Sequence, residues 1–252
     1  MQHLQVTDLH HRARIAAAAG LGLVFAVVLL SAAIRLGQIA TPRLDTGVLS
    51  VLRACHRIAA SLEVVAAAWL GWFAWRTRAA RPILARGIAV AVSITIALSV
   101  LGIVAGREPP PVAAAGNLLG GLSLLAVFAW ALGVLRGRAA RVATVVAGIG
   151  AALLTAQCLL GARISIFPAA ASSPALPAHA MLGIVLAAGT AWLALRSERG
   201  RIRIAGFGFA ILVPVAGFTA LQYESSAVAA FAHAFATALF VVAAAYTRFR
   251  PT

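Results

Sequence analysis

Three histidines and one asparagine occupy comparable places along the chain, an arrangement that can hold a flat metal macrocycle from both faces. His56, Asn117, His179 and His233 each stand near the start of a long apolar stretch. Ionisable side chains are costly inside a bilayer, so each such histidine calls for an explanation. A six-coordinate heme takes one neutral imidazole from each face, which requires ligands at equal depth on separate helices. The pattern predicts that His179 and His233 hold heme b between them.

A single histidine near a membrane surface has a simpler explanation, and zinc is a competing metal. Taken alone, His56 fits a residue that reaches toward the interface or forms a hydrogen bond there. Zinc would need a third protein ligand, and the stretches around His179 and His233 offer no Cys, Asp or Glu nearby. Heme iron therefore explains this pair better than zinc does, and His56 is a further candidate ligand.

The elements that must position these residues are membrane spans. Hydrophobic residues make up 62% of the 252 and charged residues 11%, and the mean hydropathy is +0.98, far outside the range of soluble domains. Eight apolar stretches are each long enough to cross a hydrocarbon core of about 30 Å as a helix. They are Ile15–Ile34, Ala54–Trp75, Gly87–Ala105, Val112–Leu135, Val142–Ala162, Pro177–Leu195, Ile204–Leu221 and Ala227–Thr247. The sequence predicts an all-α integral membrane protein, an eight-transmembrane-helix bundle in the lipid bilayer.

The 21 basic residues are all arginines, and their distribution indicates the topology. Fifteen lie at the two ends of the chain and in three alternate loops: Arg12, Arg14, Arg76, Arg78, Arg81, Arg86, Arg136, Arg138, Arg141, Arg196, Arg199, Arg201, Arg203, Arg248 and Arg250. The positive-inside rule makes these segments cytoplasmic, so we expect a multi-pass protein of a bacterial-type cytoplasmic membrane with both termini inside. Nucleic-acid binding would need a basic face interleaved with aromatic residues, and none is present. Cys55 and Cys158 fall inside spans, so no loop disulfide is expected.

The first four spans resemble the last four when the two sets are aligned. The alignment pairs Ala33-Ile34-Arg35 with Gly161-Ala162-Arg163, His56 with His179, Gly102 with Gly217, and Asn117 with His233. Equivalent positions are four helices apart, an even number, so both halves share one orientation about an axis along the membrane normal. We expect two parallel four-helix repeats, residues 1–141 and residues 142–252, with heme b in the second.

These residues also resemble the heme A synthase family. The resemblance rests on the short motifs Ala33-Ile34-Arg35-Leu36 and His56-Arg57-Ile58-Ala59-Ala60-Ser61, and on Gly102 and Gly217 followed by Asn117 and His233. It covers nearly the whole chain. Members of that family are four-plus-four helix bundles with one histidine at the start of each even helix. The resemblance implies that the second pair of histidines holds heme b. It also implies that the first half receives heme O and oxidises a ring methyl to the formyl group of heme A.

The first half departs from the family pattern at two positions. Asn117 replaces its second histidine, and Arg53 stands where a carboxylate is expected one turn before His56. Glu63 is the candidate catalytic residue that remains, although it lies deeper than that carboxylate. It fits either a proton-path residue or the buried partner of a Ser, Trp or Arg on another helix. The outer-loop cysteine pair of many members is absent as well. We expect the first half to hold a five-coordinate heme on His56 or an open pocket.

Arginines near the outer ends of the spans are candidates for contact with heme propionates. Arg57 follows His56 directly, and a guanidinium binds a carboxylate through two parallel hydrogen bonds. Arg35, Arg107 and Arg163 are further candidates. Each of the four also fits a simpler role, as a side chain that reaches out to the membrane interface.

Three functions are compatible with these features. The first is heme A biosynthesis by an oxidoreductase that relays electrons from heme b to the first-half site, beside a heme O-producing enzyme. The second is a b-type cytochrome that passes electrons between a membrane donor and a partner such as a respiratory complex. A small-solute transporter is disfavoured, because no broken helix pair or midplane polar cluster appears apart from Glu63. Family coverage favours the first function, and Asn117 and Arg53 favour the second.

Overall fold

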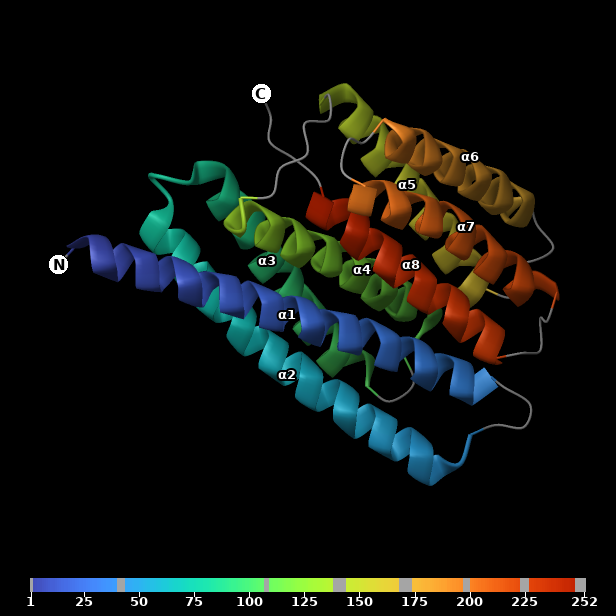
Figure 1. Ribbon diagram of the computed structural model, residues 1–252. Coiled ribbons are helices and arrows are strands. Elements are labelled where there is room, and N and C mark those ends of the chain that lie inside the picture. Colours follow the sequence, from blue (N-terminus) through green and yellow to red (C-terminus); the bar gives the residue numbers. More distant parts are fainter. Residues whose placement is uncertain are drawn as a thin grey trace. The chain divides into compact units, whose positions relative to one another are not determined.

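The protein is helical throughout the parts of the chain that its structure, a computed structural model, describes. These parts are residues 2–39, 44–106, 109–137, 144–167, 174–196, 200–222 and 227–247. They form eight α-helices (Figure 1): α1 (Gln2–Ile39), α2 (Thr46–Thr77), α3 (Pro82–Ala105), α4 (Pro111–Leu135), α5 (Thr144–Ile166), α6 (Ala175–Leu195), α7 (Gly200–Gln222) and α8 (Ala227–Thr247). All eight are long and apolar enough to cross a membrane. The predicted all-α, multi-pass membrane protein is confirmed.

Two helices begin well before the predicted spans. Helix α1 starts at Gln2 rather than Ile15, and α2 starts at Thr46 rather than Ala54. Asp45 causes the early start of α2, because its side chain accepts a hydrogen bond from the Gly47 N–H and so caps the helix. As a result His56 lies ten residues after the first residue of α2, whereas His179 lies four residues after the first residue of α6. The prediction that both histidines open their helices at the same place is therefore wrong for His56.

Prolines and glycines set several of the other helix boundaries. Helix α3 begins with Pro82 and α4 with Pro111, positions where a missing N–H costs the helix nothing. Gly106, just past the end of α3, has a φ of 66°, which favours glycine and turns the chain out of the helix. Pro214 lies inside α7 and has no N–H to donate, so the helix lacks one hydrogen bond there. Three residues later in α7 is Gly217, which lies against the His233 ring.

The chain divides into two compact units. The first contains residues 1–35, 44–142 and 241–252, and the second contains residues 36–43 and 143–240. Helices α2, α3 and α4 with most of α1 belong to the first unit, and α5, α6 and α7 with most of α8 belong to the second. The organisation as two parallel repeats, residues 1–141 and 142–252, stays a prediction.

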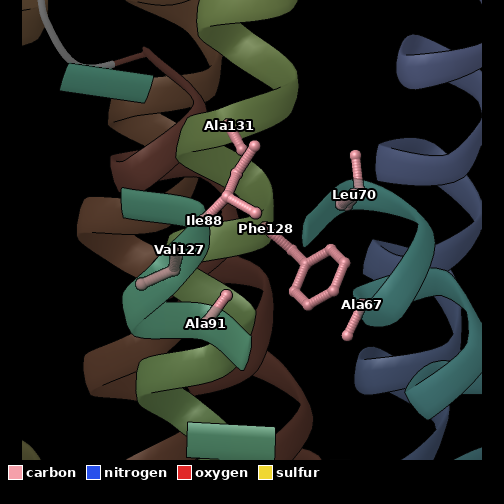
Figure 2. A pocket seen from close by; sticks show the side chains of 7 residues that line it. All are labelled: Ala67, Leu70, Ile88, Ala91, Val127, Phe128 and Ala131. Carbon is pink, nitrogen blue, oxygen red and sulfur yellow. The ribbon is translucent and has the colours of Figure 1, made fainter. Parts of the chain in front are cut away.

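Close helix packing in the first unit depends on glycines that face aromatic rings. Helix α2 packs on α3, and α3 packs on α4. Gly20 of α1 lies against the ring of Phe128 of α4, and Gly87 of α3 lies against the ring of Trp130. A Cβ at either glycine would overlap the ring, so small residues let the backbones approach. Phe128 is 1% exposed, and Figure 2 shows its ring reaching α2 beside Ala67 and Leu70.

Arginine–tryptophan pairs mark the same end of α2 and α6. The Arg76 guanidinium lies 5.8 Å from the centre of the Trp72 ring, and the Arg196 guanidinium lies 4.9 Å from the centre of the Trp192 ring. In both pairs the arginine follows the tryptophan by four residues and stands at the C-terminal end of its helix. Such pairs are typical of the membrane–water interface, where a ring stays in contact with lipid and a cation stays in contact with water.

Candidate heme site

The two histidines predicted to share a heme lie next to each other in the second unit. The ring centres of His179 on α6 and His233 on α8 are 6.2 Å apart, and the ring planes are at 87°. Two imidazoles on opposite faces of one iron have ring centres about 6 Å apart, given two metal–nitrogen bonds of about 2 Å and the distance from each nitrogen to its ring centre. The separation of His179 and His233 therefore agrees with axial coordination of one iron.

Each of these imidazoles faces a glycine on another helix of the same unit. A Cβ at Gly161 on α5 would lie 3.0 Å from Cε1 of His179, and a Cβ at Gly217 on α7 would lie 3.1 Å from Cε1 of His233. Non-bonded carbon atoms normally stand about 3.5–4.0 Å apart. Glycine at both positions therefore provides the room that the two rings occupy.

Three buried polar atoms in this region have no hydrogen-bond partner in the described part of the chain. They are Nδ1 of His179, Nδ1 of His233 and Oε1 of Gln157. Buried polar atoms are nearly always paired in folded proteins, so three unpaired atoms in one region call for an explanation, and a bound ligand is one. A neutral imidazole nitrogen without a proton is a good metal ligand. Both histidines thus keep one buried nitrogen available.

Gln157 on α5 contacts His179 and was missed in the sequence. Its side-chain nitrogen Nε2 lies 3.3 Å from Nε2 of His179, so the amide group of Gln157 is within hydrogen-bond distance of the ring and orients it. A Cβ at Gly183 on α6 would lie 3.2 Å from the Gln157 amide nitrogen, so a second glycine makes room for this side chain. A neutral amide within an apolar span is less conspicuous than an ionisable side chain. The available signal was an isolated glutamine one turn before Gly161 in an otherwise apolar span.

The ligand set at this site fits heme better than a metal ion held by protein ligands alone. Among the described residues, no three His, Cys, Asp or Glu side chains come together in a group that could hold a metal ion. Zinc sites need at least three such ligands. An iron whose other four positions are filled by a macrocycle needs only two protein ligands, and His179 and His233 would be those two. The residues present therefore fit a heme.

The arginines proposed to contact propionates lie in different environments. In the second unit Arg163 is exposed near the end of α5. In the first unit Arg57 is exposed, while Arg35 is half-buried and its buried Nε has no hydrogen-bond partner among the described residues. Arg107 lies outside the described residues. Contact of any of the four with a propionate stays a prediction.

The corresponding residues of the first unit do not reproduce the glycine–imidazole pairs. His56 on α2 and Asn117 on α4 are both half-buried, as is Arg53. A Cβ at Gly102 on α3 would meet nothing within 4 Å, whereas one at the equivalent Gly217 would meet the His233 ring. Gly217 of the second unit thus lies against an imidazole, whereas Gly102, at the corresponding position of the first unit, faces open space.

Glu63 is buried, and its partner belongs to a residue type that the sequence analysis did not consider. The Thr95 hydroxyl of α3 donates a hydrogen bond of 2.9 Å to Oε1 of Glu63. Of the two roles that the sequence left open for Glu63, a hydrogen bond to Ser, Trp or Arg is not the one observed, because the partner is a threonine. The role as a proton-path residue stays a prediction. The rotational phase of α3, which decides which hydroxyl faces α2, is not readable from so uniformly apolar a helix.

Comparison with known proteins does not assign this chain to a family. The sequence matches no protein-family model and no curated protein. The likeness to the heme A synthase family therefore rests on the short motifs of the sequence.

Proposed function

We propose that this protein binds one heme b between His179 and His233 and uses it for electron transfer in the membrane. The 6.2 Å separation of the two imidazole centres carries the proposal. The unpaired Nδ1 atoms and the two glycines opposite the rings support it. A heme iron, when bound, takes up and releases one electron. The protein's part is to supply two axial nitrogens, to orient one through Gln157 and to surround the site with apolar helices.

We further propose that the protein belongs to the heme A synthase family and acts in heme A biosynthesis, in which the ring methyl of heme O is oxidised to a formyl group. Eight membrane-spanning helices and the histidines on α6 and α8 support this proposal. In this function the first half, with His56 and the candidate catalytic residue Glu63, receives the substrate heme. The protein would then work beside a heme O-producing enzyme.

A b-type cytochrome is the second candidate function, and the first unit favours it. Asn117 provides no imidazole, and Gly102 has no ring beside it. With a single heme in the second unit, the protein would carry electrons between a membrane donor and a partner such as a respiratory complex.

Optical spectra of the purified protein test heme binding. We expect a low-spin b-type spectrum with one heme per chain in the wild type. We expect loss or a clear shift of that spectrum in His179→Ala and His233→Ala, because each change removes one axial ligand. His11→Ala, at an exposed position on α1, is the matched control and should keep the spectrum. A double variant of His179 and His233 with full, unaltered heme content would end the ligand assignment.

Extraction of the bound hemes separates the two functions. Heme O or heme A beside heme b supports biosynthesis, whereas heme b alone in cells that make heme O supports the cytochrome. The extraction uses wild-type protein, so it needs no variant to fold.

A further inference from the structure

A buried carboxyl group in the first unit lies outside the proposed heme b site. Glu63 on α2 is 6% exposed and lies within a span long and apolar enough to cross the membrane. Among the described residues, no other charged side chain is buried. Thr95 on α3 is 4% exposed, and its hydroxyl donates to the Glu63 carboxyl. This environment therefore favours one of the two protonation states of the carboxyl group over the other.

No cation in the described part of the first unit is positioned to neutralise a Glu63 carboxylate. Helix α3 carries one titratable side chain, Arg86, more than two turns before Thr95, and α4 carries none. On α2 the nearest are His56 and Arg57, of which Arg57 is exposed. On α1 they stand toward the helix ends: His10, His11, Arg12, Arg14 and Arg35. An unpaired charge within a bilayer costs several kcal/mol or more, whereas a neutral carboxyl group that accepts a hydrogen bond does not. The site therefore suits a carboxyl group that carries a proton.

A small cavity begins one helical turn from this pair. Ala67 follows Glu63 by one turn, and Ala91 precedes Thr95 by one turn, so both lie on the side of the arginine-rich turn between α2 and α3. The cavity is lined by Ala67, Leu70, Ile88, Ala91, Val127, Phe128 and Ala131 (Figure 2). Its volume of about 10 Å³ is the lower limit for one water molecule. All seven lining residues are apolar, and Glu63 and Thr95, the buried polar side chains among the described residues, lie one turn away from the lining.

We propose that Glu63 is a proton-carrying site within the membrane. Its carboxylate takes up a proton from water, and the carboxylic acid returns a proton to water, through the cavity on the arginine-rich side. Thr95 holds the carboxyl group in place by donating to Oε1. The ligand of this site is a proton, and the inference stands whether or not heme binds in the second unit.

Infrared difference spectroscopy of the protein in lipid vesicles tests protonation. At neutral pH we expect the carbonyl band of a protonated carboxyl group, which weakens at high pH and disappears in Glu63→Gln. Asp45→Asn is the control, because Asp45 is exposed at the start of α2 and asparagine also caps a helix. It should keep the band. Thr95→Val should shift the band by removing its hydrogen bond, a readout that remains if Glu63→Gln does not fold. A wild type without the band, or a band insensitive to both Glu63→Gln and Thr95→Val, would overturn the proposal.

Hydrogen–deuterium exchange of the same band tests the path. Ala67 lines the cavity and is 2% exposed, whereas the adjacent Ala68 is exposed. Ala67→Val fills the cavity and should slow the exchange several-fold relative to Ala68→Val. Equal exchange rates in the two variants would show that protons do not reach Glu63 through this cavity.

Discussion

Alanine in place of Gly161 or Gly217 would add one methyl group against an imidazole of the heme site. The new Cβ would lie 3.0 Å from Cε1 of His179 in the first variant and 3.1 Å from Cε1 of His233 in the second. Ordinary carbon–carbon contacts are about 3.5–4.0 Å, so the ring must move by about 0.5 Å or the helices must separate. Extra methyl groups in packed interiors cost about 1–3 kcal/mol.

If the displaced ring is an axial ligand, that cost falls on heme binding. A loss of about 1–3 kcal/mol corresponds to an affinity about 5–150-fold lower. The helical preference of alanine over glycine acts in the opposite direction, by about 1 kcal/mol. Gly148→Ala on α5 and Gly208→Ala on α7 isolate this preference, because a Cβ at either position meets nothing within 4 Å.

Heme titration of the apoprotein in detergent, together with thermal unfolding of each variant, measures both effects. We expect Gly161→Ala and Gly217→Ala to bind heme more weakly than wild type, and Gly148→Ala and Gly208→Ala to bind it as well as wild type. Equal heme affinity in all four variants would refute the claim that these two glycines make room for iron ligands.

Three further predictions concern the first unit and the topology. Asn117→His should raise the heme-to-protein ratio from one toward two, and a ratio that stays at one would show that the first half holds no heme pocket. Gly20→Ala, which drives a methyl group into an aromatic ring, should lower the free energy of unfolding by about 1–3 kcal/mol in a denaturant titration. Gly22→Ala meets no neighbour, so equal stability of these two variants would contradict the packing argument. A reporter fused after Arg78 should be cytoplasmic and one near Asp45 exterior, and the reverse pattern would invalidate the positive-inside assignment.

The membrane spans were predictable because lipid demands continuous apolar helices of a minimum length. Hydropathy located all eight, and the structure differs mainly at helix starts. The early start of α2 depends on a single hydrogen bond from the Gly47 N–H to Asp45, which no hydropathy average detects. Because this bond sets the start of α2, it also determines how many residues separate His56 from the first residue of its helix.

The candidate site was predictable only in part. Aligning the two halves of the sequence brought His179 and His233 into equivalent places, and the structure places them next to each other. Gln157 escaped notice because a neutral amide is less conspicuous than an ionisable group. Thr95 escaped notice for another reason: threonines in apolar helices often bond to a carbonyl of their own helix, as Thr77, Thr155, Thr190 and Thr219 do. Only the rotational phase of α3 directs Thr95 toward Glu63.

Electron paramagnetic resonance of the oxidised, purified protein tests the paired histidines most directly. The two ring planes are at 87°. Imidazole planes crossed in this way leave two iron d orbitals nearly equal in energy, so a ferric heme between His179 and His233 should give a low-spin signal with high anisotropy. We predict that signal in the wild type and in His11→Ala, and its conversion to a high-spin signal or its loss in His179→Ala and His233→Ala. A high-spin signal in the wild type, or a low-spin signal that survives both substitutions, would contradict heme ligation by this pair.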